Sequence, residues 1–99
     1  MIIYNVTSII EEDIHKEYIQ YMENIHMPAV MATGNFNDCY LLRLTEPVTE
    51  GITYCAQYIT DESSRLANYR ENYLPKLQDN LQVKFGNKLV SFRSVLEKK

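Results

Sequence analysis

Two stretches with helical periodicity, each interrupted by a proline, separate runs of strand-forming residues in this chain of 99 residues. The first stretch begins at Glu11-Glu12-Asp13, and acids suit the N-terminus of a helix. Its apolar stripe, at spacings of three and four, consists of Ile14, Tyr18, Tyr21, Met22, Ile25 and Ala29. The second stretch begins at Asp61-Glu62-Ser63-Ser64, and its stripe consists of Leu66, Tyr69, Tyr73, Leu77 and Leu81. We expect Pro28 and Pro75 to kink or end these helices, because proline disfavours helical geometry at the preceding residue.

Four segments rich in β-branched and aromatic residues surround the two helical stretches. They span residues 1–9, 36–46, 52–60 and 88–96, and Pro47 to Gly51 has the composition of a hairpin loop. The resulting order is β-α-β-β-α-β, with a weak symmetry between the two halves. It predicts an α+β, ferredoxin-like fold, in which an antiparallel four-stranded sheet carries both helices on one face. Because 99 residues cannot form two adequate cores, we expect a single domain over residues 1–99.

Two helices can cover only one face of four strands, so the other face must be accounted for. Alternation along the strands predicts a covered set made of Tyr4, Val6, Tyr40, Leu42, Leu44, Tyr54, Ala56, Tyr58, Val90 and Phe92. The opposite set consists of Ile3, Asn5, Thr7, Cys39, Leu41, Arg43, Thr53, Cys55, Gln57, Ile59, Leu89, Ser91, Arg93 and Val95. Individual strands could be assigned to faces differently, but one face would still mix aliphatic with polar residues. A water-facing sheet should be plainly polar, so we expect this face to meet a partner or a ligand.

The overall charge argues against two classes of partner. The net charge is −3 and the isoelectric point about 5.3, which disfavours both nucleic acids and anionic membrane surfaces. No apolar run approaches the roughly 18 residues of a membrane span. The chain also begins directly in a strand pattern, without the features of a signal peptide, so we expect a cytoplasmic protein. Its eight tyrosines suit positions where a ring packs and its hydroxyl stays in contact with water.

Neither the histidines nor the cysteines have the spacing of a metal site, and we expect no metal and no cofactor. His15 and His26 lie too far apart along a helix to share an ion. His26 should end the first helix and bond its last carbonyl groups, with a place in a ligand pocket as the alternative. We expect Cys39 and Cys55 on the same face, but reduced, because the hairpin pairs Cys39 with a residue near Tyr58.

Four polar residues of the mixed face complete the candidate site. Asn5, Arg43, Gln57 and Arg93 could line an interior and orient an anionic or carbonyl-bearing ligand. Alternatively, they could pair across a dimer and set its register, which is the interpretation we favour.

Several short motifs are distributed over nearly the whole chain: Met1 to Val6, His26-Met27-Pro28, Ala32 to Phe36, Gly51 to Tyr54, Gln57-Tyr58, Phe85 to Lys88 and Phe92-Arg93. They resemble those of an uncharacterised bacterial family, a domain of unknown function among the dimeric α/β-barrel proteins. The resemblance implies a ferredoxin-like fold and a homodimer that pairs through the open sheet face, and it carries no known activity. Wider relatives include monooxygenases and haem-degrading enzymes, so the fold alone assigns no chemistry.

Two functional hypotheses remain open at this point. The first is a homodimer that is non-catalytic or binds a small ligand. The second is a cofactor-independent enzyme, resembling a monooxygenase or an isomerase, with a pocket between the helices and the sheet. The enzyme requires a polar group beside a sizeable pocket, and His26 and Arg93 are the best candidates for that group.

Overall fold

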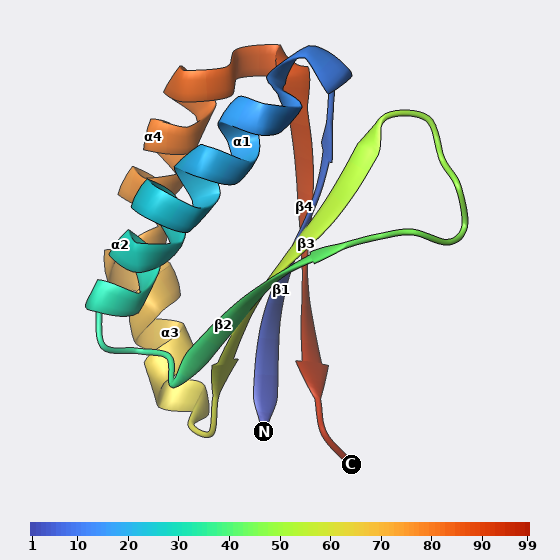
Figure 1. The fold of residues 1–99 in the computed structure, drawn as a ribbon. Coiled ribbons are helices and arrows are strands. Elements are labelled where there is room, and N and C mark those ends of the chain that lie inside the picture. Colours follow the sequence, from blue (N-terminus) through green and yellow to red (C-terminus); the bar gives the residue numbers. More distant parts are fainter.

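A computed structural model describes residues 1–99 and has two layers, a sheet and a set of helices that cover one of its faces (Figure 1). The strands are β1 (Ile2–Ile10), β2 (Asp38–Arg43), β3 (Ile52–Thr60) and β4 (Leu89–Glu97). A helical segment comprising α1 (His15–Tyr21), a π-helical turn (Met22–His26) and α2 (Met27–Ala32) connects β1 to β2. The helices α3 (Ser63–Asn72) and α4 (Leu74–Phe85) connect β3 to β4, and short 3₁₀ turns occupy Glu12–Ile14 and Gly86–Lys88.

The order of the strands confirms the predicted fold class. The sheet runs β2-β3-β1-β4, and every neighbouring pair is antiparallel. This is the ferredoxin-like arrangement of two split β-α-β halves. The second strand is shorter than predicted, because the chain leaves the sheet after Leu44, whose N–H still bonds the Thr53 carbonyl at 2.9 Å. None of the helices combines the length and the apolar character that crossing a bilayer would require.

The register corrects our assignment of residues to the two faces. For β1 and β3 the predicted assignment to the face under the helices is correct, because Tyr4, Ala56 and Tyr58 are buried there. For β2 and β4 the assignment is wrong by one residue, because Cys39 pairs with Tyr58 and Val95 pairs with Tyr4. The residues that therefore move to the helix-covered face are Cys39, Leu41, Arg43, Leu89, Ser91, Arg93 and Val95. Those that move to the open face are Tyr40, Leu42, Leu44, Val90 and Phe92.

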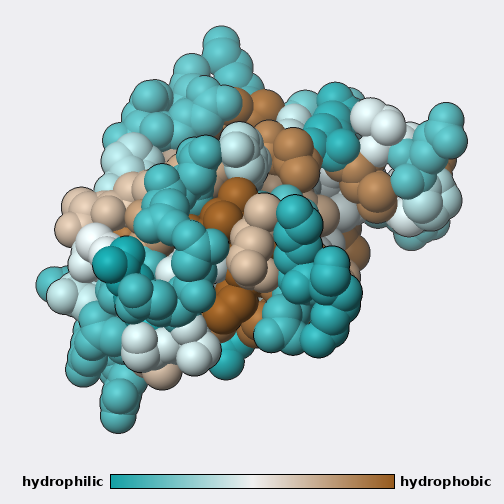
Figure 2. Space-filling model, turned by 90° about the horizontal axis from the view of Figure 1, so that it is seen from below, coloured by the Kyte–Doolittle hydropathy of each residue, from teal (hydrophilic) through white to brown (hydrophobic).

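The corrected open face is more apolar than the sequence suggested. We call the following set the open face: Ile3, Asn5, Thr7, Ile9, Asp38, Tyr40, Leu42, Leu44, Thr53, Cys55, Gln57, Ile59, Val90, Phe92, Ser94 and Leu96. Its exposed large hydrophobic residues are Ile9, Tyr40, Leu42, Leu44, Val90, Phe92 and Leu96. Asp38, at the end of an edge strand, is its only charged member. Apolar side chains also reach the surface at the lower end of the molecule, between hydrophilic groups (Figure 2).

The first helix accommodates Pro28 by widening rather than by ending. Met27 keeps helical angles (φ −63°, ψ −41°), so the prediction of non-helical geometry there is wrong. A proline ring clashes with the carbonyl group four residues earlier, which here belongs to Asn24, inside the π-helical turn. The wider turn moves that carbonyl away from the ring, and the helix continues to Ala32. Gly34 follows with φ 78°, in the left-handed conformation that suits the end of a helix.

The second helical stretch is broken beside its proline. Tyr73 has φ −125° and separates α3 from α4, whose first turn contains Pro75. Gly86, with φ 60°, ends α4 as the sequence predicts. The break lets the two helices follow the sheet in two straight pieces (Figure 1).

Aromatic rings fill the space between the two layers. Tyr4 and Phe36 stack at 6.4 Å, and the Tyr69 ring meets Phe36 edge-on at 5.1 Å. Tyr4, Tyr18, Tyr58 and Tyr69 are all fully buried. The expectation that tyrosine hydroxyls stay wet is therefore wrong for Tyr4, Tyr18 and Tyr58, whose hydroxyl groups are buried inside the protein.

Candidate functional site

A small cavity lies between the helices and the sheet, and polar side chains from both layers line it. The cavity is lined from the sheet by Tyr4, Val6, Ser8, Ala56, Tyr58 and Arg93, and from the helices by Met22, His26, Tyr69, Leu74, Gln78 and Leu81. We call it the helix–sheet cavity. Its volume is about 20 Å³, which is room for little more than one water molecule. Gln78 and Arg93 are exposed, so the cavity reaches the surface between α4 and β4.

His26 contributes an unprotonated imidazole to this cavity. The residue is the last of the π-helical turn and lies inside a continuous helix, so the predicted role at a helix C-terminus is wrong. Its ring stacks beside Tyr21, with the ring centres 6.4 Å apart. Desolvation by burial, assisted by the Arg93 charge, lowers the pKa of His26 to about 4. Of the two histidines only His15 forms a side-chain hydrogen bond, which joins its Nε2 and the Tyr54 hydroxyl at 2.7 Å.

Unpaired hydroxyl groups line the same space. The hydroxyls of Tyr4, Tyr18 and Tyr58 are buried and have no hydrogen-bond partner, and two of these residues, Tyr4 and Tyr58, line the cavity. Buried polar groups are nearly always paired, so hydroxyls of this kind indicate a place where water or a ligand binds. Burial raises the pKa of Tyr58 and raises that of Tyr18 to about 12, so all of these groups are neutral hydrogen-bond donors at pH 7.

Arg93 supplies the positive charge of the cavity. Its guanidinium lies close enough to lower the pKa values of Tyr4, His26 and Tyr69, although burial still raises those of the two tyrosines. The Arg70 guanidinium lies over the Tyr4 ring, 5.3 Å from its centre. The ion pairs of the protein use the N-terminus, Arg65, Lys84, Lys88 and Lys99. Arg70 and Arg93 therefore both lack a carboxylate partner.

The structure separates the five candidate residues into three places. His26 and Arg93 meet at the helix–sheet cavity, on the covered side of the sheet. Arg43 also lies on the covered side, at the end of β2, and Asn5 and Gln57 lie on the open face. The expectation that Arg43 and Arg93 belong to the open face is wrong, because the register of each edge strand differs by one residue from the predicted one.

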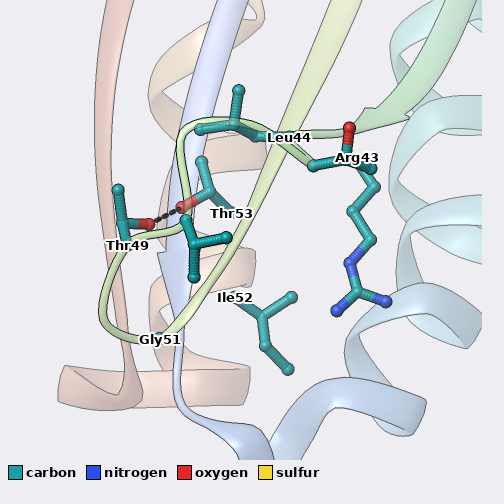
Figure 3. A pocket seen from close by; sticks show the side chains of 8 residues that line it. Arg43, Leu44, Thr49, Gly51, Ile52 and Thr53 are labelled. Atoms are coloured by element: carbon teal, nitrogen blue, oxygen red, sulfur yellow. Dashed lines mark hydrogen bonds between the residues drawn. The ribbon is translucent and has the colours of Figure 1, made fainter.

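Arg43 lines a second, larger pocket beside the β2–β3 loop. This pocket has a volume of about 310 Å³ and lies among Leu44, Val48, Gly51 and Thr53 (Figure 3). The Thr49 and Thr53 hydroxyls face one another across the loop, 3.5 Å apart. Most of the lining residues are exposed, and the one buried polar side chain among them, Thr53, already has the Thr49 hydroxyl as a neighbour. It is a poorer candidate for a site than the smaller cavity.

Asn5 and Gln57 form a polar cluster in the middle of the open face. Gln57 Nε2 donates to Asn5 Oδ1 at 3.3 Å, and Asn5 Nδ2 donates to the Thr7 hydroxyl at 2.9 Å and to the Ser94 hydroxyl at 3.3 Å. Cys55 Sγ lies 3.5 Å from the Thr7 hydroxyl. Cys39 is on the covered face, so the two cysteines are on opposite faces rather than on the same one; both thiols are free. No group of His, Cys, Asp and Glu side chains could hold a metal ion.

The sequence did not identify the tyrosines as members of the site. Tyr69 had been expected to belong only to the core, and Tyr4 and Tyr58 appeared only in the predicted covered set. The sequence did contain an indication of unpaired hydroxyls. Four tyrosines are fully buried, and each buried hydroxyl group needs a hydrogen-bond partner. Recognising it requires knowing which tyrosines are buried together, and the register supplies that information.

Comparisons with known proteins agree with this fold. The chain resembles a protein of the ethyl tert-butyl ether d (EthD) family from Bacillus halodurans, with a TM-score of 0.68, 15% identity and full coverage of both chains. It also resembles the de novo designed protein Foldit4, with a TM-score of 0.51, 7% identity and coverage of 99% and 97%. Identities this low establish a shared fold only. No curated protein matches the sequence.

The comparisons first define the class of protein, an α+β domain of the ferredoxin-like type seen in the EthD-family protein. The particular family follows from the sequence itself. Residues 1–99 match a domain of unknown function, DUF4286, and the chain belongs to that family. The resemblance that the motifs suggested is thereby confirmed.

Replacing Tyr58 by Phe should stabilise the protein. The Tyr58 hydroxyl is buried without a partner, so its removal should raise the free energy of unfolding by about 1 kcal/mol. Urea unfolding measures the change. Tyr40→Phe serves as the control, because Tyr40 is exposed and donates to Asp38 Oδ2 at 2.8 Å, so no gain is expected. A Tyr58→Phe protein less stable than the parent would mean that the hydroxyl has a partner.

Proposed function

We propose that this protein is a cytoplasmic homodimer that pairs through its open face and binds a small ligand in the helix–sheet cavity. The observation that carries the ligand-binding function is that the unpaired hydroxyls of Tyr4 and Tyr58 line one cavity with Arg93 and His26. Such groups are costly to bury without partners, so their presence around one cavity supports a site rather than a packing accident. Two free thiols suit the reducing conditions of the cytoplasm.

The composition of the open face supports pairing with a second copy. Its exposed hydrophobic residues are spread over β1, β2 and β4, and its middle carries no charge. In a two-fold dimer each residue faces the same surface of its partner, so a face without central charges can pair without repulsion. Stable dimers bury about 1,600 Å² in total. The cluster around Asn5 and Gln57 would then meet its symmetry-related copy and fix the register of the two sheets.

Two measurements test this function separately. Sedimentation at micromolar concentration should give the mass of a dimer, and a well-folded monomer would contradict the proposed assembly. A thermal-shift screen of small metabolites should find compounds that raise the midpoint of unfolding. His26→Asn and Arg93→Met should abolish that shift, because both side chains line the cavity. A ligand whose effect survives both substitutions would place the site elsewhere.

One observation also favours the second candidate function, a cofactor-independent enzyme with its site in the same cavity. His26 is unprotonated at neutral pH and could accept a proton from a substrate. A whole substrate, like a whole ligand, would need the lining side chains to move, because the cavity has a volume of only about 20 Å³. The substitution His26→Asn distinguishes the two functions. In an enzyme it would lower turnover by about a hundredfold and change the affinity for the substrate little.

A further inference from the structure

The helix–sheet cavity has the chemistry of an anion site, and this inference rests on the ligand-binding function proposed above. Its only charged member is Arg93. Neither Arg93 nor its neighbour Arg70 forms an ion pair with a carboxylate in the protein. The charges that act on Tyr4, His26 and Tyr69 are those of these two arginines. The mouth of the cavity, where Arg93 is exposed, is therefore positive and uncompensated.

Neutral hydrogen-bond donors complete the site. The Tyr4 hydroxyl is fully buried, has no hydrogen-bond partner, and lies near the guanidinium of Arg93. The Arg70 guanidinium lies over the Tyr4 ring. The neutral imidazole of His26 carries one N–H group, which it can donate. An arginine fork and a hydroxyl together satisfy the oxygens of one oxyanion, because charge-assisted bonds to a guanidinium are often bidentate.

The size of the cavity restricts the anion. Because a volume of about 20 Å³ holds little more than one water-sized group, only one oxygen of the anion enters the cavity, and the rest of the anion lies at its mouth beside Arg93. A single guanidinium at the cavity also balances one negative charge. Because Arg93 and Gln78 are exposed where the cavity meets the surface, the rest of such a molecule would extend outward between α4 and β4.

We propose that the helix–sheet cavity binds the carboxylate group of a small monocarboxylic acid, held by the Arg93 guanidinium and the Tyr4 hydroxyl beside His26. The Tyr4 hydroxyl donates to one carboxylate oxygen, and the guanidinium donates to one or both. In the free protein the Tyr4 hydroxyl is a buried donor without a partner, which costs stability. Binding of the carboxylate gives this donor a partner.

The probe for this site is sodium acetate, followed by the NMR signals of the His26 ring. Acetate should cause saturable shifts, whereas acetamide, its neutral isostere, and sodium chloride at equal ionic strength should not. Arg93→Met keeps the length of the side chain but loses the fork, and Tyr4→Phe loses only the hydroxyl. We expect each to weaken acetate binding by about tenfold to a hundredfold, the range for a hydrogen bond to a charged group. Arg65→Met, at an exposed pair with Glu62, should bind acetate like the parent.

The outcomes separate this inference from the function on which it rests. Acetamide binding as well as acetate would overturn the carboxylate assignment and leave a ligand site in the cavity. Unsaturable shifts, or shifts that survive Arg93→Met, would also overturn it. If acetate has no effect and no metabolite raises the midpoint of unfolding, both proposals fail. Should Arg93→Met not fold, Arg93→Lys decides the matter, because it keeps the charge without the fork and should bind acetate more weakly than the parent.

Discussion

Phe92→Glu should convert the proposed dimer into monomers. Phe92 lies on the open face, opposite Thr7 of β1, and is 55% exposed in a single chain. In the proposed dimer, two-fold symmetry would bury the new carboxylate twice without a counter-charge. We expect the dissociation constant to rise by at least about a hundredfold, the scale of a central interface residue. Sedimentation over a range of concentrations measures the change.

The matched control for this substitution is Val83→Glu. Val83 is 86% exposed on α4, on the helical layer rather than the sheet, so the same charge should leave the dimer intact. Circular dichroism should show that both variants remain folded, since neither position is part of the buried core. Equal dimer stability in Phe92→Glu and the parent would exclude the open face as the interface.

Acid should destabilise the protein through His26. The pKa of this histidine falls from 6.5 to about 4 on folding, mainly because burial disfavours the imidazolium. Below pH 6.5 the unfolded chain therefore binds a proton that the folded protein does not accept until about pH 4. Stability present at pH 7 is lost as the pH falls through this window. Between pH 7 and pH 4.5 the loss due to His26 should be about 2 kcal/mol.

Comparison with His26→Asn isolates this contribution, because carboxylates elsewhere also titrate in acid. Urea unfolding at fixed protein concentration should show a smaller loss between pH 7 and pH 4.5 in the variant, by the same amount. Identical losses in the two proteins would mean that the His26 ring is solvated in the folded state.

Sequence reasoning succeeded where local patterns decide the structure. The order of the elements, the β3 segment at 52–60 and the end of α4 at Gly86 all follow from periodicity and turn chemistry. It failed on the faces of β2 and β4, because alternation gives two equivalent sets and only the register chooses between them. Tyr40 and Phe92 are large and apolar, which made the covered face the natural choice. Because the open face itself carries large apolar residues, the size of Tyr40 and Phe92 does not indicate which face of their strands is covered.

The candidate site was predicted in part, and partly for the wrong reason. His26 was selected as a possible pocket residue but was expected to end a helix, and it lies within one. Arg93 was selected on the wrong face of the sheet. The tyrosine hydroxyls were not selected, because a hydroxyl without a partner is a property of packing and no local pattern of residues reveals it.

The π-helical turn at Met22–His26 also changes how this segment compares with related sequences. Buried residues of the first helix fall at Ile14, Tyr18 and Met22, then at Met27 and Val30, so the stripe advances by one position across the turn. This explains why Ile25, predicted to be buried, is exposed. A relative with a regular helix here should therefore be one residue shorter, and an ungapped alignment would set solvent-facing positions against core positions from Met27 onward. Placing a single gap within Met22–His26 restores the correspondence, and it marks the turn in sequences whose structures are unknown.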